Sequence, residues 1–209
     1  HYPVFIWSLF FGLILGSVYF IGQRVEKWTS GVKVWMVLGT LASIGLAFLP
    51  QAQENSAWWY VLICGAVSIS GMTLPGISGS FLLILMGNYE LLLIRSVTNF
   101  DVTMLSLFIG GSILGLIGLS NLLAWVLRHY HDRTMALLTG FVLGSLLIIW
   151  PWQRPIKTTL DANGHEIVLL YQRYWPDFSL GHTWLAVAIM LLGLGLIFGL
   201  EYSANRRAK

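Results

Sequence analysis

The sequence predicts an all-α polytopic membrane protein built from inverted repeats, with a re-entrant helical hairpin and a small extramembrane β-hairpin. Of its 209 residues, 56% are hydrophobic and only 10% are charged, and apolar segments recur along the whole chain. One segment near the amino terminus also recurs later at a constant offset. The net charge of +3 comes from few ionisable groups. We therefore expect membrane lipids as surroundings and no nucleic-acid partner.

Five apolar segments approach the roughly 20 residues that a helix needs to cross a bilayer. We expect these spans at residues 4–22, 33–50, 102–127, 133–150 and 182–202. The first lacks a basic region before it, so it fits a span better than a cleavable signal peptide.

Two shorter apolar runs, at about 58–73 and 77–94, form an interrupted pair. The single cysteine, Cys64, lies inside the first run and is expected to be a buried small hydrophobic residue. The pair is either one broken span or a re-entrant hairpin that enters and leaves on the same side.

The basic residues favour the hairpin, because cytoplasmic loops of membrane proteins are enriched in Lys and Arg. The hairpin divides the basic residues eight inside to four outside, whereas a broken span gives seven to five. The expected inside set is Arg24, Lys27, Lys33, Arg128, Arg133, Arg206, Arg207 and Lys209, and the outside set is Arg95, Arg154, Lys157 and Arg173.

An internal repeat supports the same topology. Seven of 17 aligned positions are identical at an offset of 128 residues, from His1-Tyr2 with His129-Tyr130 to Leu15-Gly16-Ser17 with Leu143-Gly144-Ser145. In the hairpin topology the two copies cross the membrane in opposite directions, as in many alternating-access transporters. The offset also places a counterpart of Pro75 upstream of the first residue, so we expect the chain to lack most of its first repeat.

We therefore expect one transmembrane domain over residues 1–209. Residues 1–32 would end the first repeat, and 33–150 would form the second repeat, with the hairpin at about 58–94. Residues 151–181 would form an outer loop, and 182–209 the last helix and a cytoplasmic tail. Within the loop, Asn163-Gly164 lies between two strand-like runs, which predicts a β-hairpin. Aromatic residues near the span ends predict an interfacial belt: Trp150, Trp152, Tyr171, Tyr174 and Trp175.

The most informative motif is Leu74-Pro75-Gly76-Ile77-Ser78-Gly79-Ser80-Phe81, a polar, helix-breaking stretch between the two short runs. Pro75 lacks a backbone N–H, and glycine permits turns and close approaches that other residues resist. A helix that restarts here would present unpaired N–H groups, and such groups attract anions. The alternative is a simple helix kink.

Residues 65–90, from Gly65-Ala66 to Asn88-Tyr89-Glu90, closely resemble the second-half signature of the PopT-type polyprenyl-phosphate translocase family. That resemblance implies a multi-pass protein of the bacterial plasma (inner) membrane, without a cofactor, that returns undecaprenyl phosphate from the outer to the cytoplasmic leaflet. The family carries a Pro-Gly-x-Ser-Gly motif in each half, whereas this chain shows the second alone.

The resemblance implies a binding site for the lipid phosphate at the motif. Gly76, Ile77, Ser78, Gly79 and Ser80 would cradle the phosphate through N–H groups and hydroxyls, and Pro75 would fix the turn. Glu90 and Arg95 follow the second short run; Arg95 would be a phosphate partner, and Glu90 its counter-ion or a proton carrier. Interfacial anchoring is the alternative role for both.

Two other functions fit parts of the sequence. Gly76-Ile77-Ser78-Gly79 also matches the nucleophile motif of rhomboid-type intramembrane proteases, with His182 as the best candidate base, but a protease leaves Pro75 and the repeat unexplained. A carrier of another anionic lipid or a small anion would use the same cradle. We expect no catalytic residue, metal site or ATP-binding loop, because the required patterns are missing from the spans. Small-residue helix faces leave a homodimer open.

Overall fold

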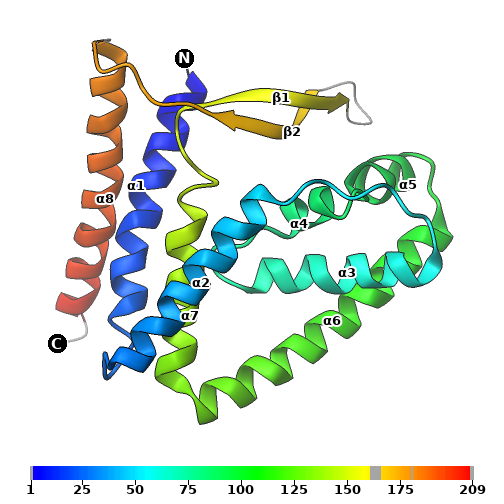
Figure 1. The fold of residues 1–209 in the computed structure, drawn as a ribbon, viewed down its shortest axis with the longest axis horizontal. Helices are drawn as coiled ribbons and strands as arrows, with labels where there is room; N and C mark the ends of the chain where they lie inside the picture. The colour runs from blue at the N-terminus through cyan, green and yellow to red at the C-terminus, as the bar shows by residue number, and fades with distance from the viewer. Residues whose placement is uncertain (1, 161–165, 180, 208–209) are drawn as a thin grey trace.

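The computed structural model describes residues 2–160, 166–179 and 181–207 (Figure 1). It is mainly helical, with one two-stranded sheet. The elements in chain order are α1 (Tyr2–Gly22), α2 (Ser30–Phe48), α3 (Trp58–Thr73), α4 (Gly79–Leu85), η1 (Glu90–Arg95), α5 (Ser96–Thr98), α6 (Val102–His129), α7 (His131–Ser145), β1 (Gln153–Leu160), β2 (Glu166–Arg173) and α8 (Gly181–Arg207).

Four helices, α1, α2, α6 and α8, are long and apolar enough to cross a membrane. Only 6% of the most apolar stretch of α6 is buried within the protein. A helix that is apolar yet exposed along most of its length suits contact with lipid rather than water. The predicted polytopic helical class is therefore confirmed.

The predicted span 133–150 is too long at its carboxyl end. Helix α7 ends at Ser145 after 15 residues. Beyond it the backbone tightens into turns, in which the N–H groups of Leu147 and Ile148 donate to carbonyls three residues earlier, at 3.1 and 2.9 Å. Such i-to-i+3 bonds close a helix and turn the chain toward the following Pro151.

The long helices form two parallel pairs, α1 with α8 and α2 with α7, and the two pairs run in opposite directions (Figure 1). Each pair crosses closely at a glycine, because added methyl groups at Gly12 and Gly140 would collide with the backbone carbonyls of Met190 and Met36. Gly12 and Gly140 are related by the 128-residue offset of the repeat. The structure therefore contains the repeat in inverted form.

The partner helices repeat as well, with a different offset that sequence inspection missed. A methyl group added at Gly39 of α2 would collide with the Leu137 carbonyl, and one added at Gly193 of α8 would collide with the Leu9 carbonyl. Both Met36–Met190 and Gly39–Gly193 are separated by 154 residues. Five of the 19 residues of α2 are identical at this offset, and the shared helix crossing gives the match its structural meaning.

The interrupted pair is a re-entrant hairpin whose two arms start and end at the same end. Asn88, after α4, is fully buried and bonds the backbone of Asn55, which precedes α3. Between the arms, Cys64 of α3 packs with Leu83 of α4 and Leu92 of η1 in a buried apolar cluster. Cys64 is therefore buried, as expected.

The second arm of the hairpin is shorter than predicted. In place of one run over 77–94, α4 ends at Leu85 and the chain bends by 116° before Glu90. Gly87 makes this bend with a φ of +74°, a conformation that glycine adopts without strain. Chain direction therefore changes before Glu90 and Arg95 are reached.

One end of the molecule carries the α1–α2 loop, the α6–α7 turn and the carboxyl end of α8 (Figure 1). This is the end that the basic residues predict to be cytoplasmic.

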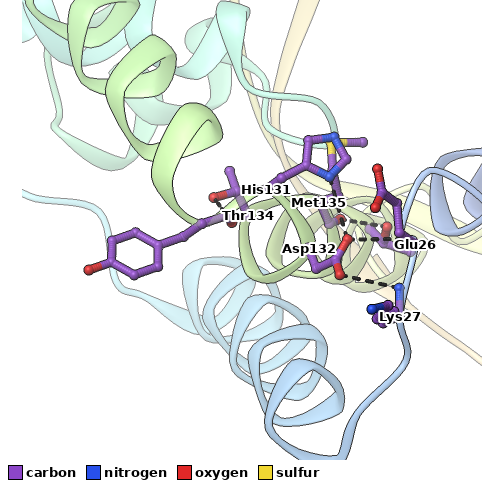
Figure 2. Close-up of polar contacts among 8 residues, drawn as sticks. Glu26, Lys27, His131, Asp132, Thr134 and Met135 are labelled. Carbon is purple, nitrogen blue, oxygen red and sulfur yellow. Dashed lines mark hydrogen bonds and ion pairs between the residues drawn. The ribbon is translucent and has the colours of Figure 1, made fainter.

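At this end, Asp132, in the first turn of α7, accepts hydrogen bonds from the N–H groups of Glu26 (2.9 Å) and Lys27 (3.2 Å) (Figure 2). The Glu26 N–H is the main cause of a lowered Asp132 pKa, and His131 contributes. Asp132 thus ties the loop to α7.

The opposite end carries the predicted β-hairpin. Strands β1 and β2 pair antiparallel, for example Thr159 with Ile167. The predicted turn at Asn163-Gly164 lies outside the described residues. At the base of the strands, Trp150 packs edge-on against Phe11 of α1 at 5.8 Å and donates a hydrogen bond to the Tyr174 carbonyl at 3.0 Å. The predicted aromatic residues therefore gather where α7 leads into β1.

Candidate substrate site at the hairpin tip

The hairpin tip, residues 74–78, is pressed against α7. Gly76 has a φ of +86°, and a methyl group added there would lie 2.7 Å from the Val142 nitrogen and 2.8 Å from the Phe141 carbonyl. Only glycine combines this dihedral angle with so close an approach. The sequence thus places Gly76 where the tip must meet α7.

The residues that follow the tip supply hydrogen-bonding groups. Ser78 precedes α4 with an extended backbone and does not cap the helix; its hydroxyl instead shares a 2.9 Å hydrogen bond with the Ser80 hydroxyl. The first N–H groups of a helix have no partner inside it. In the described chain, the N–H groups of Gly79 and Ser80 have no assigned acceptor. Because α4 has only seven residues, these local donors matter more than any helix dipole.

A cavity of about 400 Å³ lies beside the tip. This volume is within the range of about 300–1,000 Å³ that is usual for small-ligand sites. Pro75, Gly76, Ile77 and Ser78 line one side of it. Three residues of α1 line it together with their repeat counterparts: Ile14 with Val142 and Ser17 with Ser145 of α7, and Ile21 with Ile149 just after α7.

This pairing places the cavity between the two repeats, because each pair is separated by the same 128 residues as the repeat itself. Inverted-repeat transporters bind substrate at such an interface. Ser17 and Ser145 were not predicted as site residues, although the repeat alignment pairs them. Their hydroxyls donate to the carbonyls of Leu13 and Val142, at 2.9 and 2.8 Å, within their own helices.

Gly79 and Ser80 begin α4 directly after Ser78 and are not among the described residues that line the cavity. Glu90 and Arg95 are not brought to the tip. Glu90 lines a different cavity, of about 310 Å³, together with Glu54. Arg95 pairs with that same Glu54 carboxylate. The bend after α4 separates these two residues from the motif, although they follow it closely in sequence.

The walls of the tip cavity are apolar apart from backbone groups and the hydroxyls of Ser17, Ser78 and Ser145. No Asp, Glu, Lys, Arg or His is among the described residues that line it. His182, the candidate protease base, instead lies in the first turn of α8. Since the Ser17 and Ser145 hydroxyls donate within their own helices, the donor that the lining side chains offer to an anion is the Ser78 hydroxyl, paired with that of Ser80. The described lining side chains include no general base.

Comparison with known proteins finds three matches. The undecaprenyl phosphate translocase-like family matches residues 1–167. A polyprenyl-phosphate transporter of Vibrio cholerae is 37% identical over 98% of this chain and 68% of its own length. A polyprenyl-phosphate transporter of Staphylococcus aureus is 30% identical over 69% of this chain and 58% of its own length. The chain thus spans about two thirds or less of these relatives. No solved structure matches it significantly.

Proposed function

The chain belongs to the undecaprenyl phosphate translocase-like family, and on this premise we propose that it carries undecaprenyl phosphate across the bacterial plasma membrane. The direction we propose is from the outer to the cytoplasmic leaflet, which would recycle the lipid for cell-envelope synthesis. In this function the protein binds and moves the lipid, and no covalent bond is made or broken.

The difficulty in this movement is the charge of the phosphate. An anion that leaves water for hydrocarbon loses its hydration at a large free-energy cost unless protein groups replace the water. We propose that the N–H groups at the start of α4 and the hydroxyls of Ser78 and Ser80 provide this replacement. Pro75, Gly76 and Ile77 shape the turn that presents them.

The observation that carries the proposal is the tip cavity between the repeats. Its walls come from both inverted copies, through Ser17 of α1 and Ser145 of α7. A site shared in this way can be exposed to either side when the repeats rock against each other. The polyprenyl tail would remain in the lipid while the headgroup occupies the cavity.

A carrier for another anionic lipid would need the same cradle and remains the second candidate. The apolar residues around the cradle, such as Ile77 and Phe81, suit a lipid better than a small hydrated anion. Glu90 and Arg95 enter this proposal as anchors of the hairpin base, because Arg95 is already paired with Glu54.

The test is binding of undecaprenyl phosphate to the purified protein, with neutral undecaprenol as the comparison lipid. We expect the Ser78→Ala/Ser80→Ala variant to lose about tenfold in affinity for the phosphorylated lipid, equivalent to about 1.4 kcal/mol. Its binding of undecaprenol should not change. A Gly79→Leu variant is less informative, because a side chain there would collide with the Ser68 carbonyl and disturb the hairpin.

The matched control is Ser106→Ala/Ser120→Ala, which removes two hydroxyls from exposed positions of α6. This control should bind both lipids like the wild type. Equal binding of the two lipids by the wild type, or an unchanged affinity in the Ser78/Ser80 variant, would contradict the hydroxyl cradle.

A further inference from the structure

The tip cavity leaves the negative charge of a phosphate without a cationic partner among its described lining residues. A second cavity, of about 1160 Å³, adjoins it at the end of the molecule predicted to be cytoplasmic. The two cavities share Ser17 and Ile21 of α1 as lining residues. They are therefore adjacent along one helix.

A cationic side chain lines the second cavity. Arg24 lines it, one short turn beyond Ile21, whose carbonyl accepts a 3.1 Å hydrogen bond from the Arg24 N–H. Ser17, Ile21 and Arg24 are spaced by four and three residues, which places them along one face of the helix and its final turn. This face leads from the tip cavity to the guanidinium.

Arg24 differs from Arg95 in its partners. Arg95 is paired with Glu54. The Arg24 side chain is exposed and has no hydrogen bond or ion pair within the described residues. A guanidinium binds phosphate oxygens with two parallel hydrogen bonds, so an unpaired arginine at a cavity wall is well suited to a phosphate monoester.

We propose that Arg24 is a second phosphate-binding station, which receives the headgroup of the carrier lipid from the hairpin tip on the cytoplasmic side. This inference rests on the proposed function. The headgroup passes from the hydroxyls around Ser78 along Ser17 and Ile21 to the Arg24 guanidinium. Along this path the phosphate exchanges the neutral hydroxyl donors of the tip for the positively charged Arg24 guanidinium as it reaches the aqueous side.

Glu201 of α8 lines the same cavity and also has no ion pair within the described residues. Its carboxylate repels a phosphate anion that is bound to Arg24. Glu201 would therefore weaken the station and favour release into the cytoplasmic leaflet. The Glu201→Gln variant should bind the phosphorylated lipid more tightly than the wild type.

The test compares binding of undecaprenyl phosphate and undecaprenol by the wild type and by Arg24→Gln, Arg24→Lys and Arg128→Gln. Arg128→Gln is the matched control, because it removes an exposed arginine from the same end of the molecule without lining either cavity. We expect Arg24→Gln to lose about tenfold in affinity for the phosphorylated lipid and none for undecaprenol. Arg24→Lys should recover part of this loss, since a lysine keeps the charge but not the paired geometry.

The outcomes separate this inference from the proposed function. Phosphate-selective binding by the wild type, combined with equal affinities of Arg24→Gln and Arg128→Gln, would overturn the Arg24 station alone. A wild type that does not distinguish the two lipids would contradict the proposed function and this inference with it. Competition by inorganic phosphate identifies the ligand: we expect little displacement of the lipid, and efficient displacement would show a station for the free anion.

Discussion

The Asn88 side chain closes the base of the re-entrant hairpin on the backbone of Asn55. Its amide donates a 2.8 Å hydrogen bond to the Asn55 carbonyl, and its oxygen accepts one of 2.9 Å from the Asn55 N–H. Asn88 is fully buried. One side chain thereby satisfies two backbone groups and holds the start of α3 beside the end of α4.

Replacing Asn88 with Ala should destabilise the protein by about 2 kcal/mol, because it leaves both backbone groups of Asn55 without their partner. Thermal unfolding of the purified protein in detergent measures this loss. Asn121→Ala, at an exposed position of α6, is the control and should unfold like the wild type. An Asn88→Ala variant as stable as the control would mean that the hairpin does not depend on this contact.

Gly76→Ala should destabilise the hairpin tip by about 1–2 kcal/mol through its left-handed dihedral angle alone. The added methyl group would also press on the Val142 nitrogen of α7. Gly118→Ala adds the same methyl group to α6, where no atom lies within 4 Å, and should be neutral or slightly stabilising. The same unfolding assay separates the two, and equal midpoints would argue against a tip pressed on α7.

The repeat predicts matched effects at Gly12 and Gly140. Valine at either position would force a helix pair apart, and overpacking of this kind typically costs about 1–3 kcal/mol. Gly199→Val, on α8 with open space around it, is the control. Unfolding midpoints should fall by similar amounts in the two repeat variants and little in the control. A loss confined to one variant would show that the two crossings are not equivalent.

The Asp132 contact predicts a specific pH dependence. The Glu26 N–H, as the largest cause, lowers the pKa of the Asp132 carboxyl below its ordinary value, which is about 3.9. A group whose pKa is lowered by folding stabilises the folded state fully above its unfolded pKa and loses this effect as pH falls through the folded pKa. Asp132→Asn should therefore lower the unfolding midpoint at neutral pH.

The difference between the wild type and Asp132→Asn should stay constant from about pH 7 to about pH 5, and should shrink only at pH values below about 4. Because the carboxylate is near the surface, the difference should be small. Unfolding midpoints across this pH series give the comparison. A difference that vanishes between pH 7 and pH 5 would contradict the assignment of this effect to the Asp132 carboxyl.

Much of the fold could be predicted because the membrane imposes long apolar helices, and these are visible as runs of residues. The helix breaks were harder to place. Helix α4 ends at Leu85, just before the bend at Gly87, within an apolar run. The tight turns after Ser145 likewise follow α7 before its apolar sequence ends. Hydropathy does not register such local backbone geometry, so both helices were predicted too long.

The site was predictable in part for the same reason. Pro75 to Ser78, which line the tip cavity, stand out in the sequence because they include helix breakers inside an apolar region. Glu90 and Arg95 were included because a continuous second arm was expected, and the 116° bend directs them elsewhere. Ser17 and Arg24 were not predicted as site residues, because their part in the cavities depends on how α1 packs against the tip and α8.

The most direct test of the central claim is transbilayer movement of undecaprenyl phosphate in vesicles that contain the purified protein. The wild type should transfer the lipid between leaflets faster than protein-free vesicles do. Ser78→Ala/Ser80→Ala should lose most of this acceleration, and Ser106→Ala/Ser120→Ala should keep it. Transfer at the protein-free rate by the wild type, or full activity in the Ser78/Ser80 variant, would contradict a carrier that holds the phosphate at the hairpin tip.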